Sequence, residues 1–206
     1  MEKITAQEFW QWFQDHSEHL MDIDNIDPFE ADELMKEFEK TLALYSEGMS
    51  FEMSDLTEKG REIVFSAEGD EDYFDDVIAL VENTPVLDFW EINAFKQPKG
   101  PNVKIKFENY VYASKNLWFL PLENEEFEET IGLMVGVPDF KENDEDQEIA
   151  VYTLIETMIG EYDCTTLLEY FEICQLPEDP EAEGFTNLTN LPEYIDWHLN
   201  NIQGKD

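Results

Sequence analysis

Two helices are predicted at the start of the chain by apolar residues that recur every three or four positions. The first covers residues 5–21 and opens with a capping box between Thr5 and Glu8. An Asp-Pro pair at 27–28 starts the second helix, and Gly48 is expected to end it. The inward side of the first helix is expected to carry Phe9, Trp12 or Phe13, His16 and Leu20. The short connection implies an antiparallel helical pair.

The pattern then changes to the two-residue alternation that is typical of β-strands. Residues 49–53 and 62–66 are expected to form a hairpin around the turn at 55–60. Further strands are expected at residues 89–95, 103–107, 110–112, 117–120 and 131–137. Further helices are expected at residues 70–83, 146–159 and 191–202, whereas residues 165–176 fit either a strand or a helix.

This order of elements, with helices in runs and strands in hairpins, predicts an α+β fold. We expect a mainly antiparallel sheet of about five to seven strands with helices packed on it, beside the N-terminal helical pair. No repeat and no linker rich in Gly or Ser interrupts the chain. We therefore expect a single domain over residues 1–206, with residues 1–48 as a candidate helical subdomain.

Charge changes this picture more than any motif does. The 206 residues contain 50 Asp and Glu against 12 Lys and Arg, which gives a formal net charge of −38. Self-repulsion of this size favours disorder, but 42% hydrophobic and 14% aromatic residues argue for a folded core. The excess of carboxylates disfavours binding to duplex nucleic acid, which needs Lys and Arg at the phosphates, and disfavours anionic membranes.

The expected compartment is a reducing cytoplasm. The first residues lack the basic and apolar regions of a signal peptide, and no apolar run approaches the length of a membrane span. The two cysteines, Cys164 and Cys174, are then better explained as thiols than as a disulfide.

Three short stretches resemble an uncharacterised group of acidic bacterial cytoplasmic proteins. They are residues 90–96 after the Thr-Pro pair at 84–85, residues 117–122, and residues 159–161. The resemblance spans most of the chain and consists of apolar strands and turns. It implies a bacterial α+β domain, and it implies no activity, because none is established for the group.

Candidate catalytic constellations are sparse. His16 and His19 lie three residues apart on a helix and are candidate metal ligands, but the spacing of a zincin is missing, so a core-boundary His16 and a solvated His19 are favoured. A nucleophilic Cys164 would sit among carboxylates that raise the pKa of a thiol. No phosphate-binding or nucleophile-elbow motif occurs. We expect no cofactor.

The strongest functional signal is therefore the acidic surface. Eleven acids lie between Glu123 and Glu148 against Lys141 alone, whereas five lysines lie between residues 96 and 116. A field of this kind steers basic partners, as in proteins that inhibit cationic toxins or nucleases or that imitate nucleic acid. The expected contact residues are Glu123, Glu125, Glu126, Glu128, Glu129, Asp144, Glu145 and Asp146.

The leading hypothesis is a non-enzymatic protein that binds a basic protein partner. Two alternatives stay open. One is an enzyme with a divalent metal bound by carboxylates, and the other is a housekeeping domain whose acidity serves only solubility.

Overall fold

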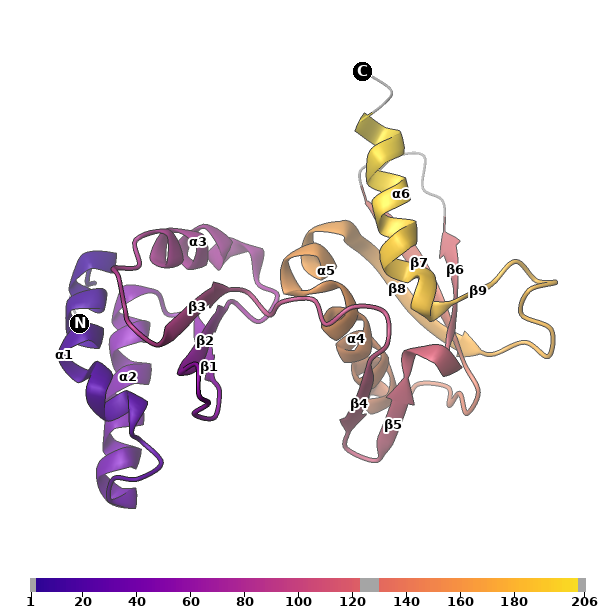
Figure 1. The fold of residues 1–206 in the computed structure, drawn as a ribbon. Helices are drawn as coiled ribbons and strands as arrows, with labels where there is room; N and C mark the ends of the chain where they lie inside the picture. The colour runs from indigo at the N-terminus through magenta and orange to yellow at the C-terminus, as the bar shows by residue number, and fades with distance from the viewer. Residues whose placement is uncertain (1–2, 123–129, 204–206) are drawn as a thin grey trace. The chain divides into compact units, whose positions relative to one another are not determined.

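The described residues form two compact units, each with its own hydrophobic core. The computed structural model describes residues 3–122 and 130–203 (Figure 1). The N-terminal unit comprises Met1–Lys96 and the C-terminal unit comprises Gln97–Asp206. The expected single α+β domain over residues 1–206, with residues 1–48 as a candidate helical subdomain, stays a prediction.

The N-terminal unit combines a helical pair with a small three-stranded sheet (Figure 1). Helices α1 (Ala6–Met21) and α2 (Pro28–Tyr45) contact each other, as predicted. Strands β1 (Ser50–Met53) and β2 (Arg61–Ser66) form the expected antiparallel hairpin. A 3-10 turn (Glu71–Tyr73) and α3 (Phe74–Glu82) then lead to β3 (Trp90–Ala94), which pairs with β2 in parallel.

Aromatic rings fill the core of the N-terminal unit. Phe9 and Phe38 are fully buried, and the Phe9 ring meets the Phe65 ring edge-on with centroids 5.7 Å apart. Trp10, which the helical pattern did not place inward, is 2% exposed, and its indole N–H donates to the Leu80 carbonyl at 2.8 Å. That bond ties α1 to α3 and satisfies the one polar atom of a buried tryptophan side chain.

The C-terminal unit contains a separate hairpin and a four-stranded sheet (Figure 1). Its strands are β4 (Lys104–Phe107), β5 (Tyr110–Ala113), β6 (Trp118–Leu122), β7 (Ile131–Val137), β8 (Leu168–Gln175) and β9 (Thr186–Asn187). Its helices are α4 (Glu145–Ile159), α5 (Glu161–Leu167) and α6 (Leu191–Gln203), with 3-10 turns at Ser114–Asn116 and Leu188–Asn190. The β4–β5 hairpin packs against α4, and the larger sheet has the order β8-β7-β6-β9.

The α+β class and the helical pair are confirmed, whereas a single sheet of five to seven strands is wrong. Within residues 3–122 and 130–203, the strands divide into sheets of three, two and four strands. Parallel pairs arise between β2 and β3 and between β7 and β8, because a helical connection separates the two strands and returns the chain in the same direction. The ambiguous residues 165–176 contain both structures, since α5 ends at Leu167 and β8 begins at Leu168.

None of the helices in the described part of the chain is both long and apolar enough to cross a membrane.

The buried Arg61 organises one end of the N-terminal unit. Its side chain is 2% exposed and forms an ion pair with Asp24. The guanidinium also donates to the Met21 carbonyl at 2.9 Å and to the Ser54 carbonyl at 2.7 Å. The backbone N–H of Arg61 donates to the Phe89 carbonyl at 3.0 Å. One side chain and its amide thus connect the end of α1, the end of β1 and the residue before β3.

Gly60 makes room for that arrangement. Its φ is +109°, and a Cβ atom there would lie 1.8 Å from the Phe89 carbonyl oxygen. Phe89 itself has a φ of +64°, which a bulky residue adopts only when its surroundings impose it. By contrast, Gly48 does not end α2 through its own conformation, since the cap is Ser46; a Cβ on Gly48 would instead overlap the Tyr73 ring.

We expect Gly60→Ala to destabilise the protein by more than about 3 kcal/mol, because backbone strain is added to an overlap that only backbone movement can relieve. Gly100→Ala is the matched control, since Gly100 has a φ of +81° but no atom within 4 Å of the place that its Cβ would take. The control should lose only about 1–2 kcal/mol. Urea unfolding followed by circular dichroism measures both, and equal losses would contradict the close-approach argument.

Candidate partner-binding site

The candidate site is the start of α4, where three of the eight expected contact residues lie. Asp144 caps the helix, and Glu145 and Asp146 lie in its first turn. The other five, Glu123, Glu125, Glu126, Glu128 and Glu129, lie outside the described residues. Of the expected contact residues, the structure therefore describes only Asp144, Glu145 and Asp146.

Asp144 is held inside its own unit. Its carboxylate accepts from the Gln147 backbone N–H at 3.0 Å and from the Tyr110 hydroxyl on β5. The Lys141 ammonium lies 3.8 Å away. The Tyr110 hydrogen bond, helped by the Gln147 N–H and by Lys141, holds the pKa of Asp144 below its ordinary value. Asp144 thus fastens the start of α4 to β5.

Gln147 follows on the inward side of α4 and is completely buried. Its amide nitrogen donates to the Tyr112 hydroxyl at 2.7 Å and to the Asp139 carbonyl at 3.0 Å. Its amide oxygen accepts from the Lys141 backbone N–H at 2.7 Å. Burial, with the nearby Asp139 charge, raises the pKa of Tyr112 to about 12, so this hydroxyl stays protonated and can serve in the network.

Sequence reasoning did not single out Gln147. A local signal was present, because Gln147 follows the capping Asp144 by three residues and precedes the buried Ala150 and Val151 by three and four. A polar residue at that spacing lies on the inward side of a helix. What it would bond to depends on β5 and on the 138–141 segment, which the helix pattern does not describe.

Four other carboxylates at the start of α4 and just before it are exposed to solvent. Glu142, Glu145, Asp146 and Glu148 are exposed and are called the acidic patch below. In the described part of the chain, none of these four has a hydrogen bond or an ion pair from its side chain. Residues 141–146 surround an open hollow of about 470 Å³. The positive end of the α4 dipole lowers the repulsion among the four charges without neutralising them.

The lysine-rich strand does not neutralise the patch. Lys104 and Lys106 are exposed on β4, while Ile105 and Phe107 pack against the core, so the expected alternation is confirmed. Neither lysine forms an ion pair with any residue in the described ranges. Lys141 is the nearest cation along the chain, and its ammonium is taken up by the Tyr110 hydroxyl at 2.8 Å and the ring face at 4.7 Å.

The histidine pair is arranged as the favoured interpretation predicts. His19 is exposed, and His16 is half-buried with its ring stacked on Trp12 and its Nδ1 atom 2.7 Å from the Trp12 carbonyl oxygen. Over the ranges that the structure describes, no three His, Cys, Asp or Glu side chains are close enough together to hold a metal ion.

Both cysteines are free thiols, as expected from the sequence. Cys164 is 1% exposed, and burial, together with the charges of Glu156 and Asp163, raises the pKa of its thiol to about 12. Cys174 is half-buried, and burial also raises the pKa of its thiol. A thiol with a raised pKa is a poor nucleophile because the reactive thiolate is scarce.

The described residues define an α+β protein of two compact units, with an acidic patch at the start of one helix. Comparison with known proteins gives no match: no family model fits the chain, no curated protein matches its sequence, and no solved structure matches it. Membership of the acidic bacterial group stays an expectation from the sequence.

Gln147→Ala should destabilise the protein by about 2–4 kcal/mol, because it leaves the Tyr112 hydroxyl, the Asp139 carbonyl and the Lys141 N–H without their buried partner. The neighbouring exposed Glu148→Ala should change stability by no more than about 0.5 kcal/mol. Urea unfolding of both variants measures the difference, and a neutral Gln147→Ala would contradict the anchoring role of this network.

In the native protein, Cys174 should react with Ellman's reagent on the order of 10-fold or more faster than Cys164. The Cys174→Ser variant should then show almost no reaction until urea unfolds it, whereas Cys164→Ser should keep the faster phase. A fast thiol remaining in Cys174→Ser would contradict the burial of Cys164.

Proposed function

We propose that this chain is a non-enzymatic, acidic binding protein that engages a basic protein partner through the start of α4. The type of action would be that of an inhibitor or immunity protein, or of a nucleic-acid mimic. One observation carries the proposal: the four carboxylates of the acidic patch are exposed and lack any ionic or hydrogen-bonding partner in the described part of the chain. The five glutamates at 123–129 stay candidate contacts on sequence grounds.

The charge balance supports the proposal independently of any single residue. If every one of the 12 Lys and Arg were paired with a carboxylate, 38 of the 50 carboxylates would still lack a cation. That excess exceeds the net charge of about 2–8 that suffices for the solubility of a small domain. Such a field raises the association rate of a basic partner and suppresses acidic competitors.

The fixed position of the acidic patch also supports the proposal, and it depends on Asp144 and Gln147. Because these two side chains fasten the start of α4 to the β4–β5 hairpin, the acidic patch projects from a fixed helix end. Charges that are already positioned lose little conformational freedom on binding. The partner-facing surface would therefore be ordered before the partner arrives.

The test removes the four charges without changing side-chain size. The variant carries Glu142→Gln, Glu145→Gln, Asp146→Asn and Glu148→Gln. A control variant loses four other exposed carboxylates, through Glu30→Gln, Glu39→Gln, Glu47→Gln and Glu58→Gln. Both variants have a net charge of −34, since each removes four of the 38 excess negative charges.

Tagged wild-type and variant proteins are used to capture partners from a lysate of the source cell, and bound proteins are eluted in salt steps. We expect one basic protein to stay bound beyond the ~0.15 M salt at which weak surface attraction is screened. The control should retain it, and the patch variant should release it at lower salt. Equal retention by the wild type, the patch variant and the control would exclude the acidic patch as the binding site. Early elution of many basic proteins would favour the alternative that the acidity serves only solubility.

A further inference from the structure

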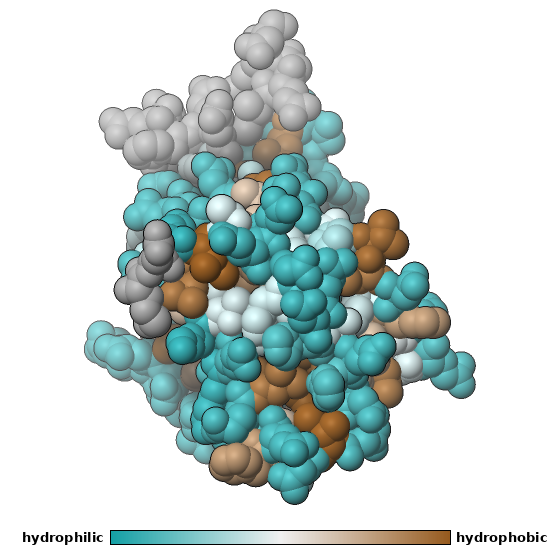
Figure 2. Space-filling view, turned by 90° about the vertical axis from the view of Figure 1, so that its left-hand side faces the viewer, coloured by the Kyte–Doolittle hydropathy of each residue, from teal (hydrophilic) through white to brown (hydrophobic). Residues whose placement is uncertain are grey.

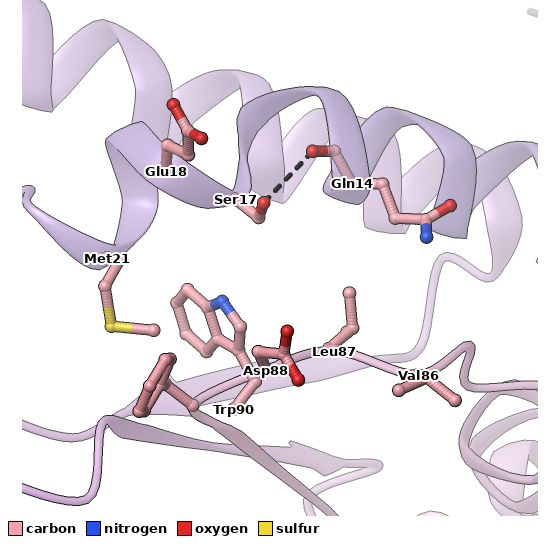
Figure 3. A pocket seen from close by; sticks show the side chains of 9 residues that line it. Gln14, Ser17, Glu18, Met21, Val86, Leu87, Asp88 and Trp90 are labelled. Atoms are coloured by element: carbon pink, nitrogen blue, oxygen red, sulfur yellow. Dashed lines mark hydrogen bonds between the residues drawn. The ribbon is translucent and has the colours of Figure 1, made fainter.

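The N-terminal unit contains a concave site that is separate from the acidic patch. It lies between the second half of α1 and residues 86–90, the segment that leads into β3 (Figure 3). Its volume is about 540 Å³, within the range of pockets that accept small ligands or peptide side chains. In Figure 3 the Trp90 indole points from the segment toward α1, with the Met21 side chain beside it.

Apolar side chains form part of the pocket lining, and one of them, Trp90, is anchored in the core. Met21, Leu87, Phe89 and Trp90 contribute the apolar surface of the pocket. The Trp90 ring meets the core residue Phe13 edge-on, with centroids 5.1 Å apart, so its position does not depend on a ligand. The Trp90 indole N–H has no hydrogen-bond partner in the described part of the chain. This group can therefore donate to a ligand.

Two of the residues that line the pocket are acidic. Glu18 on α1 and Asp88 on the opposite segment both line it and are both exposed. Neither carboxylate forms an ion pair with any residue in the described ranges. Among the residues for which the structure gives positions, no Lys or Arg lines the pocket. Electrostatic complementarity therefore selects a cationic ligand and rejects an anionic one.

Two apolar side chains that line the pocket are largely exposed to water. Val86 is 93% exposed and Phe89 is 71% exposed. Figure 2 shows the side of Figure 1 on which α1 and α2 lie. This face is largely hydrophilic, with separate hydrophobic groups exposed on it. Isolated exposed apolar residues are ordinary, but these two line one concavity together with Leu87 and Trp90.

The backbone of Phe89 holds this side chain outward. Its φ of +64° is maintained by the hydrogen bond from the Arg61 N–H to the Phe89 carbonyl and by the absence of a side chain on Gly60. The strain is not offset by burial of the ring, since the ring is mostly in water. Strained residues of this kind concentrate where a surface is held ready for a ligand.

We propose that this pocket binds a basic peptide segment of a protein, with a bulky apolar side chain entering between α1 and residues 86–90 and flanking Lys or Arg residues beside it. The apolar side chain would pack on Trp90, Leu87 and Met21. The flanking cations would pair with Glu18 and Asp88, and a cation over the half-buried indole ring would add to the attraction. A second copy of the chain is disfavoured as the occupant, because two proteins with a net charge of −38 repel each other.

This inference rests on the proposed function in one respect, since both assign a basic protein as the partner. It does not depend on the acidic patch, because every residue that it uses belongs to the N-terminal unit. The two proposals can therefore fail separately.

The probe is a short blocked peptide, acetyl-Gly-Lys-Phe-Lys-Gly-amide, added to the full-length ¹⁵N-labelled protein at about 0.15 M salt. Two comparison peptides replace Phe by Ser or both Lys by Glu. The readout is the indole N–H signal of Trp90 in the NMR spectrum, identified by its loss in Trp90→Phe. We expect this signal to shift with the Lys-Phe-Lys peptide and to stay unchanged with the other two.

Variants separate pocket binding from attraction to the overall charge. Removing both acidic charges of the pocket lining, by Glu18→Gln with Asp88→Asn, should raise the Kd of the peptide about three- to tenfold. The acidic patch variant removes four charges elsewhere and should change the Kd by less than about twofold. Thermal midpoints within about 2 °C of the wild type show that the exposed substitutions leave the fold intact.

Three results would overturn the pocket proposal: a Trp90 signal that does not move, equal binding of the Lys-Ser-Lys peptide, or an equal loss of affinity in the acidic patch variant. The last result would leave the proposed function standing as attraction by the overall charge. Conversely, if the acidic patch variant retains the lysate partner, the patch is excluded as the binding site. The pocket proposal would still stand if the peptide shifts the Trp90 signal.

Discussion

The structure of the N-terminal unit depends on the buried guanidinium of Arg61, the only arginine in the chain. Removing a cation from water is unfavourable unless its donors are satisfied, and the planar fork of an arginine can satisfy several acceptors at fixed angles. Here it bonds the carbonyls of Met21 and Ser54 and the carboxylate of Asp24. Met21 ends α1, Asp24 lies in the turn after it, and Ser54 follows β1, so one side chain joins the segments in which both elements end. The amide of the same residue positions Phe89, and through it the segment that forms one wall of the pocket.

In the C-terminal unit, mostly neutral side chains satisfy the buried polar groups at the start of α4. The buried Gln147 amide, the hydroxyls of Tyr110 and Tyr112, and the capping Asp144 connect the start of α4 to β5 and to the segment that follows β7. Because a buried polar network is stabilising only when each member is bonded, its geometry leaves little freedom to the helix end. Asp144 is therefore taken up by the fold, whereas the four carboxylates of the acidic patch beside it are exposed to water.

Local sequence signals anticipated much of the fold. The capping box at Thr5 and the Asp-Pro pair at 27–28 mark the helix starts that the structure contains. These signals succeed because capping satisfies backbone groups with side chains only two or three residues away. The same local reasoning misplaced Trp10 and passed over Gln147, since each is buried with a partner far along the chain, 70 residues away for Leu80 and 35 for Tyr112.

The sequence alone thus determined most helices, most strands, the α+β class and the excess of negative charge, because periodicity, capping and composition are properties of short segments or of the whole count. Only the tertiary structure decided that the strands divide among three sheets, that β2 and β3 and then β7 and β8 pair in parallel, and that the core is divided in two. It also decided that Asp144 and Arg61 serve the fold while Glu18, Asp88 and the acidic patch face water. The physical reason is that strand partners and the satisfaction of buried polar groups are set by contacts between distant residues, which a local pattern of apolar and polar positions does not contain.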